Sequence, residues 1–168
     1  MAPVAISAVQ PSPNFQTADL GALRIARPQN WEIVDNQQNS ATIAPRAGVS
    51  GGAVAYGVVI RVARVGANTS ATQITTAIAQ NLQKSDSNMK VLGQVQPVTV
   101  SGSSGGSVQL ETNSPMTGAD GKAQREQDWL VSVQRGNSAI YFVFVSPAAN
   151  FEQLRPTFEK MLASVQFR

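Results

Sequence analysis

The sequence predicts an α+β fold in which an antiparallel β-sheet is flanked by helices on both faces, an α/β/α sandwich. Two segments, 53–65 and 138–146, are apolar on both faces, which is typical of strands that are covered on both sides. Two others, 70–84 and 150–163, repeat apolar residues every three or four positions, as amphipathic helices do. The strand-rich middle of the chain leaves few crossovers, which argues against a doubly wound parallel sheet.

The first half of the chain is expected to lead through short strands into a long central one. In order, we expect strands at 22–27, 31–34 and 41–44, a loop at 45–52 and a strand at 53–65. The first of these alternates Leu23 and Ile25 with arginines, the period-two pattern of a strand. Small residues on one face of the last strand would let a helix approach closely, so this strand should be central.

The second half is expected to hold both helices and a closing hairpin. We expect a helix at 70–84 and a second one within 150–163. Between them we expect strands at 91–95, 97–100 and 107–112, a long strand up to 135 and a strand at 138–146. Loops are expected at 101–106 and 113–123. Gly136 and Asn137 suit a two-residue hairpin turn because both tolerate a positive φ. Pro156 is expected to start the main segment of the last helix or to kink it.

A length of 168 residues indicates one domain with a sizeable core. Residues 1–14 contain Pro3, Pro11 and Pro13 and are predicted to form a linker or tether, with the single domain at 15–168. The first residues lack the basic region of a signal peptide. The sequence contains no run of about 18 apolar residues, the length that is needed to span a membrane.

Histidine and cysteine are both absent, which restricts the chemistry of the chain more than any motif does. This absence excludes disulfides, thiolate catalysis, a Ser-His-Asp triad and zinc or iron sites built from histidine or cysteine. The formal net charge is +3, but the 13 lysines and arginines are scattered, which argues against nucleic-acid binding. We therefore expect no catalytic residue, no metal site and no cofactor, and we predict that the chain is not an enzyme.

Three stretches resemble the PsbP-like family. Residues 23–31 (LRIARPQNW) resemble its opening of strand, proline and tryptophan, and residues 139–147 (AIYFVFVSP) and 158–167 (FEKMLASVQF) resemble its end. That family includes the extrinsic photosystem II subunit and a nuclear-import factor that binds the Ran GTPase. The resemblance covers about residues 15–168 and implies the α/β/α sandwich. It carries over no functional residue, because the family's histidine-containing metal sites and Ran-binding acidic patch have no counterpart here.

Similar modules occur in exported bacterial proteins, some of them after the catalytic region of membrane-associated zinc metallopeptidases. The chain has no H-E-x-x-H motif, so in such an enzyme it could only be a noncatalytic tail. From this resemblance we expect an extracytoplasmic location, either periplasmic or membrane-associated through a parent chain.

Three carboxylates are the best candidates for chemistry. Glu126 and Asp128 share one strand face at period two, and Glu111 could lie across from them. Paired carboxylates can act as general acid and base. The adjacent Arg125 and the pattern of the face favour a solvated sheet edge, and we adopt that interpretation.

The remaining motifs have structural interpretations. The segments 117–122 and 101–106 could bind a cation or an anion, but loops between strands are the preferred interpretation. The sequence Asn68-Thr69-Ser70 matches a glycosylation pattern, and a helix cap explains it fully. Trp31 and Trp129 are expected to fill the core or seal the end of the sheet. Four arginines are expected to lie over apolar surface, and the alternative is a basic face for an acidic partner: Arg24, Arg61, Arg64 and Arg135.

Two classes of function remain. The first is a noncatalytic binding or accessory domain of a larger exported bacterial protein that acts through protein–protein contacts, with a zinc metallopeptidase as one candidate parent. The alternative is a small-ligand binder or carboxylate-dependent enzyme with a cleft between sheet and helix. A deep pocket with converging polar groups would favour the alternative. A shallow patch with an apolar rim would favour the first.

Overall fold

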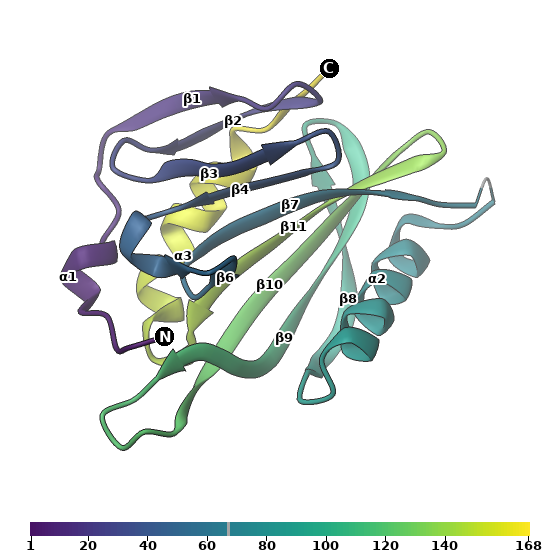
Figure 1. Ribbon diagram of the computed structural model, residues 1–168. Coiled ribbons are helices and arrows are strands. Elements are labelled where there is room, and N and C mark those ends of the chain that lie inside the picture. Colours follow the sequence, from purple (N-terminus) through teal and green to yellow (C-terminus); the bar gives the residue numbers. More distant parts are fainter. Residues whose placement is uncertain (67) are drawn as a thin grey trace.

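The computed structural model describes every residue except residue 67. Its main sheet has the order β3-β4-β7-β11-β10-β9-β8, and every pairing in it is antiparallel (Figure 1). The strands are β3 (Glu32–Gln37), β4 (Ser40–Ala44), β7 (Gly57–Arg64), β8 (Lys90–Val100), β9 (Ser103–Thr117), β10 (Ala123–Arg135) and β11 (Ser138–Pro147). Two smaller sheets hold β1 (Phe15–Asp19), β2 (Leu23–Pro28) and β12 (Gln166–Phe167), and β5 (Val49–Ser50) and β6 (Ala53–Val54). The helices are α1 (Ile6–Val9), η1 (Arg46–Gly48), α2 (Ala71–Ser85) and α3 (Ala148–Ala163).

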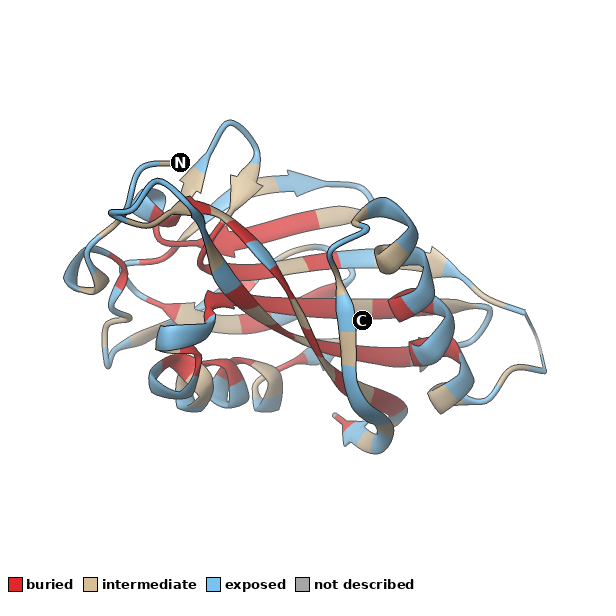
Figure 2. Ribbon diagram, turned by 90° about the horizontal axis from the view of Figure 1, so that it is seen from below, coloured by how far each residue is buried: buried red, intermediate tan, exposed pale blue. Residues whose placement is uncertain are grey.

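The two long helices cover opposite faces of the main sheet, which confirms the predicted α/β/α arrangement. Successive residues of a strand point to opposite faces. In β10, Leu130 packs in one buried cluster with Ile74 of α2, while the next residue, Val131, packs in a second cluster with Phe158 of α3. Buried residues accordingly follow the strands and the inner sides of these helices, whose outer sides are exposed (Figure 2). We call the two sides of the sheet the α2 face and the α3 face.

The strand expected at 53–65 is interrupted, and its predicted cover on both faces is wrong. β6 and β7 are separate, and Gly57, the first residue of β7, has a φ of 141°. A Cβ at Gly57 would lie 2.5 Å from the carbonyl oxygen of Ile43, so the chain comes too close to β4 here for any larger residue. β7 is an interior strand, as expected, but its Arg61 is exposed on the α2 face. β11, in contrast, is buried on both faces along most of its length.

Other boundaries differ from the prediction because strand pairing extends further than the turn residues suggest. The loop expected at 101–106 is a turn at Ser101 and Gly102 alone, since β9 begins at Ser103. The loop expected at 113–123 shortens in the same way, because β9 and β10 pair as far as Thr117 and Ala123. Pro156 lies inside α3 rather than in its first turn.

Residues 1–14, expected to be a tether, lie against the domain. Val9 is fully buried, and its carbonyl oxygen accepts a hydrogen bond from the indole nitrogen of Trp31 at 3.1 Å. The backbone of Met1 bonds with Thr117 and with Pro115, at the end of β9. This segment therefore contributes to the packing of the core on the α3 face.

Candidate functional site

The α2 face of the main sheet is covered by helix over only part of its width. α2 packs on β8, β9 and β10. Beyond them the face continues across β11, β7 and β4 to the edge strand β3 (Figure 1). On this part of the face Tyr141 and Val59 are half-buried and Arg61 is exposed. The sheet therefore presents side chains to solvent beside the helix.

A groove of about 390 Å³ lies on this open part of the face, between β3, β4, β7 and the β5–β6 hairpin. Four valines contribute to its lining, and none of them is fully buried: Val34, Val49, Val54 and Val59. Polar groups complete the lining, among them Asp35 and Arg61. We call this feature the valine groove. It is an open hollow rather than an enclosed cavity.

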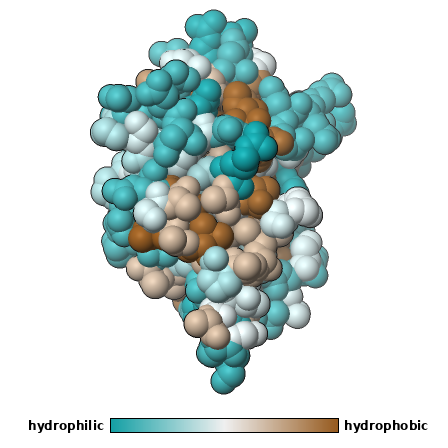
Figure 3. Space-filling view, turned by 60° about the vertical axis from the view of Figure 1, so that its left-hand side comes forward, coloured by the Kyte–Doolittle hydropathy of each residue, from teal (hydrophilic) through white to brown (hydrophobic). Residues whose placement is uncertain are grey.

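The edge strand of the groove exposes an apolar side chain where strands normally expose polar ones. Val34 of β3 is 38% exposed and lines the groove, while its neighbour Ile33, 37% exposed, pairs with Ile43 and lies on the α3 face. A register shift between Ile33 and Asp35 makes Val34 an extra residue in β3, which turns it and Asp35 together toward the groove. Figure 3 shows the side of the molecule that lies to the left in Figure 1, where apolar surface gathers within a hydrophilic surround.

The charges of the groove differ in how they are satisfied. Asp35 accepts a hydrogen bond from the side-chain amide of Gln37 at 3.2 Å. Glu32, nearby on β3, forms an ion pair with Arg46 at 2.6 Å. Within the described part of the chain, Arg61 takes part in no ion pair, although it is exposed. The groove thus combines apolar surface with a cation that can accept an outside carboxylate.

The prediction that Glu126 and Asp128 lie on a solvated edge is wrong, because both are buried. Their exposed fractions are 7% and 2%. They lie on the α2 face of β10, in line with Leu130, next to Thr112 of β9. Thr112 donates a hydrogen bond of 2.5 Å to Asp86, the residue that caps the C-terminal end of α2. We call Glu126 and Asp128 the acid pair.

The surroundings of the acid pair oppose its ionisation. Burial, followed by the charge and hydrogen bonding of Asp128, raises the pKa of Glu126 to about 10. Burial also raises the pKa of Asp128 to about 7, while its hydrogen bond with Glu126 lowers it and the charge of Asp86 raises it. One oxygen of Asp128, Oδ1, has no hydrogen-bond partner in the described part of the chain. The pair therefore retains at least one proton at neutral pH.

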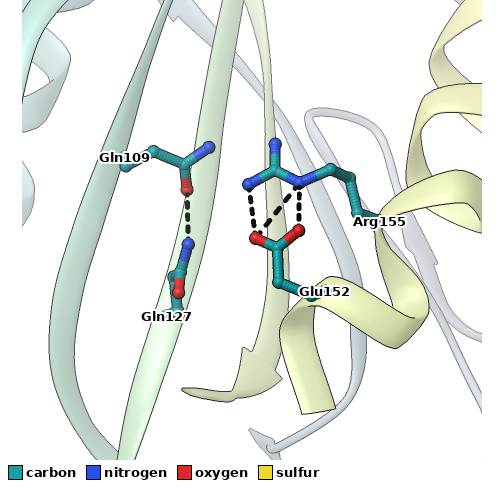
Figure 4. Close-up of polar contacts among 4 residues, drawn as sticks. All are labelled: Gln109, Gln127, Glu152 and Arg155. Atoms are coloured by element: carbon teal, nitrogen blue, oxygen red, sulfur yellow. Dashed lines mark hydrogen bonds and ion pairs between the residues drawn. The ribbon is translucent and has the colours of Figure 1, made fainter. Parts of the chain in front are cut away.

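The sequence had allowed Glu111 to lie across from Glu126 and Asp128, but Glu111 is not part of the acid pair. It lies on the α3 face, where it forms an ion pair with Arg125. That face carries further polar contacts near α3, shown in Figure 4. Gln127 donates to Gln109 at 3.2 Å, and Arg155 pairs with Glu152 at 2.9 Å. The three carboxylates are thus divided between two faces.

The remaining candidates have structural roles. Trp31 is fully buried, and Trp129 is half-buried with its ring stacked 5.2 Å from that of Phe144, so both tryptophans belong to the packing as expected. The segment 118–122 closes the hairpin between β9 and β10. Ser70 caps α2, which confirms the structural interpretation of residues 68–70.

The four strand arginines do not gather into one basic face. Arg24 forms an ion pair with Asp19, and Arg135 lies 4.7 Å from the centre of the Phe167 ring. Arg61 and Arg64 are both exposed, but they point to opposite faces of β7.

Among the described residues, no group of three or more acidic side chains is arranged to hold a metal ion. None of the described helices has the length and apolar character needed to cross a membrane.

No family model and no curated protein sequence matches the chain, but solved structures do. The cyanobacterial PsbP protein CyanoP of Synechocystis sp. PCC 6803 matches with a TM-score of 0.61 and 8% identity over 92% of both chains. The Ran-binding protein Mog1p of Saccharomyces cerevisiae matches with a TM-score of 0.63 and 11% identity over 92% of this chain and 95% of its own. A protein of Bacteroides thetaiotaomicron matches with a TM-score of 0.56 and 12% identity, over 48% of its own length. At these identities the likeness shows the fold alone, and the chain has the PsbP-like fold that its ends predicted.

Proposed function

We propose that the chain is a noncatalytic binding domain that acts through protein–protein contacts at the valine groove. The observation that carries this proposal is the groove itself, in which four incompletely buried valines lie beside an exposed arginine that has no ion-pair partner among the described residues. Apolar surface with a polar rim is typical of interaction sites. Mog1p, named for binding Ran, has the same fold, but at 11% identity that partner does not transfer.

The chemistry of the groove indicates the kind of partner. The valines offer shallow apolar contacts, and Arg61 offers a guanidinium that can bind a carboxylate through two hydrogen bonds. An apolar segment of a protein that also carries an Asp or Glu side chain would satisfy both. The net charge of +3 favours the approach of such an acidic segment.

The acid pair is the one observation in favour of the alternative, a carboxylate-dependent enzyme or small-ligand binder. Raised pKa values are typical of catalytic acids. A general acid must also come within hydrogen-bonding distance of its substrate. Exposed fractions of 7% and 2% leave Glu126 and Asp128 little contact with anything outside the fold, so the binding domain is the better supported proposal.

The parent protein is a further part of the proposal. We infer a larger exported bacterial protein, with the noncatalytic C-terminal module of a zinc metallopeptidase as the specific candidate. The support is the resemblance to modules of exported proteins and the absence of histidine and cysteine from this chain. An immunoblot of fractionated native cells should show a band heavier than 17.7 kDa outside the cytoplasm. A cytoplasmic band of 17.7 kDa would contradict this part.

Photo-crosslinking in the native host tests the groove as a binding site. A photoreactive amino acid at Val34, 38% exposed in the groove, should give a discrete crosslinked product with another protein. The same amino acid at Asn81, exposed on α2 away from the groove, is the control and should not give that product. Identical products from both positions, or none from Val34, would contradict the proposal.

A further inference from the structure

The acid pair lies where α2 ends, and the two features are physically connected. Asp86 caps the C-terminal end of α2 and accepts the hydroxyl of Thr112 through its Oδ2. Its Oδ1 accepts the backbone N–H of Asn88 at 3.0 Å, and its backbone oxygen accepts that of Met89 at 3.1 Å. One carboxylate therefore joins the last turn of the helix, the loop after it and the sheet.

Among the residues that the structure describes, the groups that face the acid pair include no cation that could balance it. From α2 comes Asp86, whose charge acts on both members of the pair. From β9 comes the neutral Thr112, while Glu111 points to the other face with Arg125. From β11 come Val145 and Pro147, which are directly opposite in register. On β8, Lys90 pairs with Glu111 and so lies on the α3 face, and Lys84 of α2 is exposed.

The position relative to α2 adds to this imbalance. The C-terminal end of a helix carries partial negative charge from its free carbonyl groups. Three carboxyl groups beside such an end repel one another and the helix unless a proton separates them. Of the three, only Asp86 is partly exposed and stands on a loop, so it is the group that can move.

We propose that Asp86, Glu126 and Asp128 form a proton-dependent latch that holds the C-terminal end of α2 and the loop at 86–89 on the sheet. While the pair keeps its proton, Glu126 donates to Asp128, and Asp86 stays bonded to Thr112. When the proton is lost, the ionised acid pair repels the carboxylate of Asp86. Release of Asp86 from Thr112 relieves this repulsion and the cost of buried charge. The last turn of α2 then loosens, while α3, on the other face, does not.

Amide hydrogen exchange of the folded protein at pH 8 and pH 11, on either side of the folded pKa of about 10 for Glu126, tests the latch. After correction for the intrinsic pH dependence of exchange, the protection of the Asp86 and Met89 amides should fall by about tenfold or more, the factor for one pKa unit. Amides in the middle of α3 are the internal control and should change less. The side-chain amide in Glu126→Gln donates a hydrogen bond as the protonated acid does and cannot ionise, so in this variant protection at Asp86 and Met89 should persist at pH 11.

Constant protection at Asp86 and Met89 across this range, or an equal fall in Glu126→Gln, would overturn the latch. A direct titration keeps the test independent of any variant. The side-chain carboxyl carbon of Glu126, followed by NMR in the unaltered protein, should titrate above pH 6. A midpoint near the ordinary glutamate value of about 4.3 would overturn the proposal.

Discussion

At the scale of single residues, the acid pair shows how a strand position decides chemistry. Glu126 and Asp128 continue the face of β10 that Leu130 and Ser132 occupy, and all four are buried. Burial of carboxyls without a cation favours their protonated form in the folded state. The free energy of unfolding must therefore depend on pH through these two groups.

We expect stability to fall as the pH rises. A carboxyl with a raised pKa in the folded state gives its full contribution below its unfolded pKa of about 4, and loses it as the pH rises toward the folded value. For Asp128 and Glu126 those folded values are about 7 and about 10. Urea unfolding at pH 5.5 and pH 9 should show this fall in the parent and a smaller fall in Glu126→Gln.

Glu111→Gln is the matched control for this prediction. It makes the same chemical change on the opposite face, in an ion pair whose side chains are 31% and 48% exposed. Such a pair contributes about 1 kcal/mol or less. A fall in Glu126→Gln equal to that of the parent would show that the buried carboxyl does not set the pH dependence.

Phe158 is the residue on which the α3 face of the core depends most clearly. It is fully buried, and its ring lies 5.1 Å from that of Phe144, 5.8 Å from Phe151 and 6.2 Å from Trp31. Truncation of a buried phenylalanine costs roughly 3–5 kcal/mol. Phe158→Ala should lower the free energy of unfolding by that amount. Phe167→Ala, at a half-buried position, should lower the free energy of unfolding clearly less. Equal losses in the two variants would contradict the assignment of Phe158 to the core.

At the scale of elements, α2 shows what local sequence can specify. Its Ser70 accepts the N–H of Gln73, and the Gln73 side chain accepts the N–H of Ser70, which completes a capping box. Ser70→Ala should lower the free energy of unfolding by about 1 kcal/mol. Chemical denaturation would measure this, with Ser87→Ala, an exposed serine beyond the helix, as the control. A loss no larger than that of Ser87→Ala would count against the cap.

The strands show what local sequence does not specify. Ser103 to Gly106 have a loop composition, yet they lie in β9 because β8 pairs with all four and β10 pairs with Gly105 and Gly106. Gly105 and Gly106 are suited to this position, since a Cβ on either would overlap Ser132 of β10 or Thr75 of α2. The need for close approach comes from residues distant in sequence, so composition alone indicated a turn.

At the scale of the whole molecule, the sequence predicted the layers but not the site. Apolar spacing at 70–84, 138–146 and 150–163 was enough to predict α2, β11 and α3 and the α/β/α order. The valine groove depends on which strands α2 leaves uncovered and on a bulge at Val34, and neither is visible in a local pattern. The burial of Glu126 and Asp128 did have a signal, because they share the period-two face of Leu130, but the nearby Arg125 outweighed it.

The central claim is that the chain works by binding a protein at the valine groove, and a pair of charge reversals tests it most directly. Arg61→Glu and Lys84→Glu change the net charge equally at exposed positions, but only Arg61 lines the groove. Quantitative mass spectrometry would compare the proteins that copurify with each variant from native cells. We predict a partner that is recovered with the parent and with Lys84→Glu and is lost with Arg61→Glu. A partner recovered equally with both variants, or lost with both, would contradict the account.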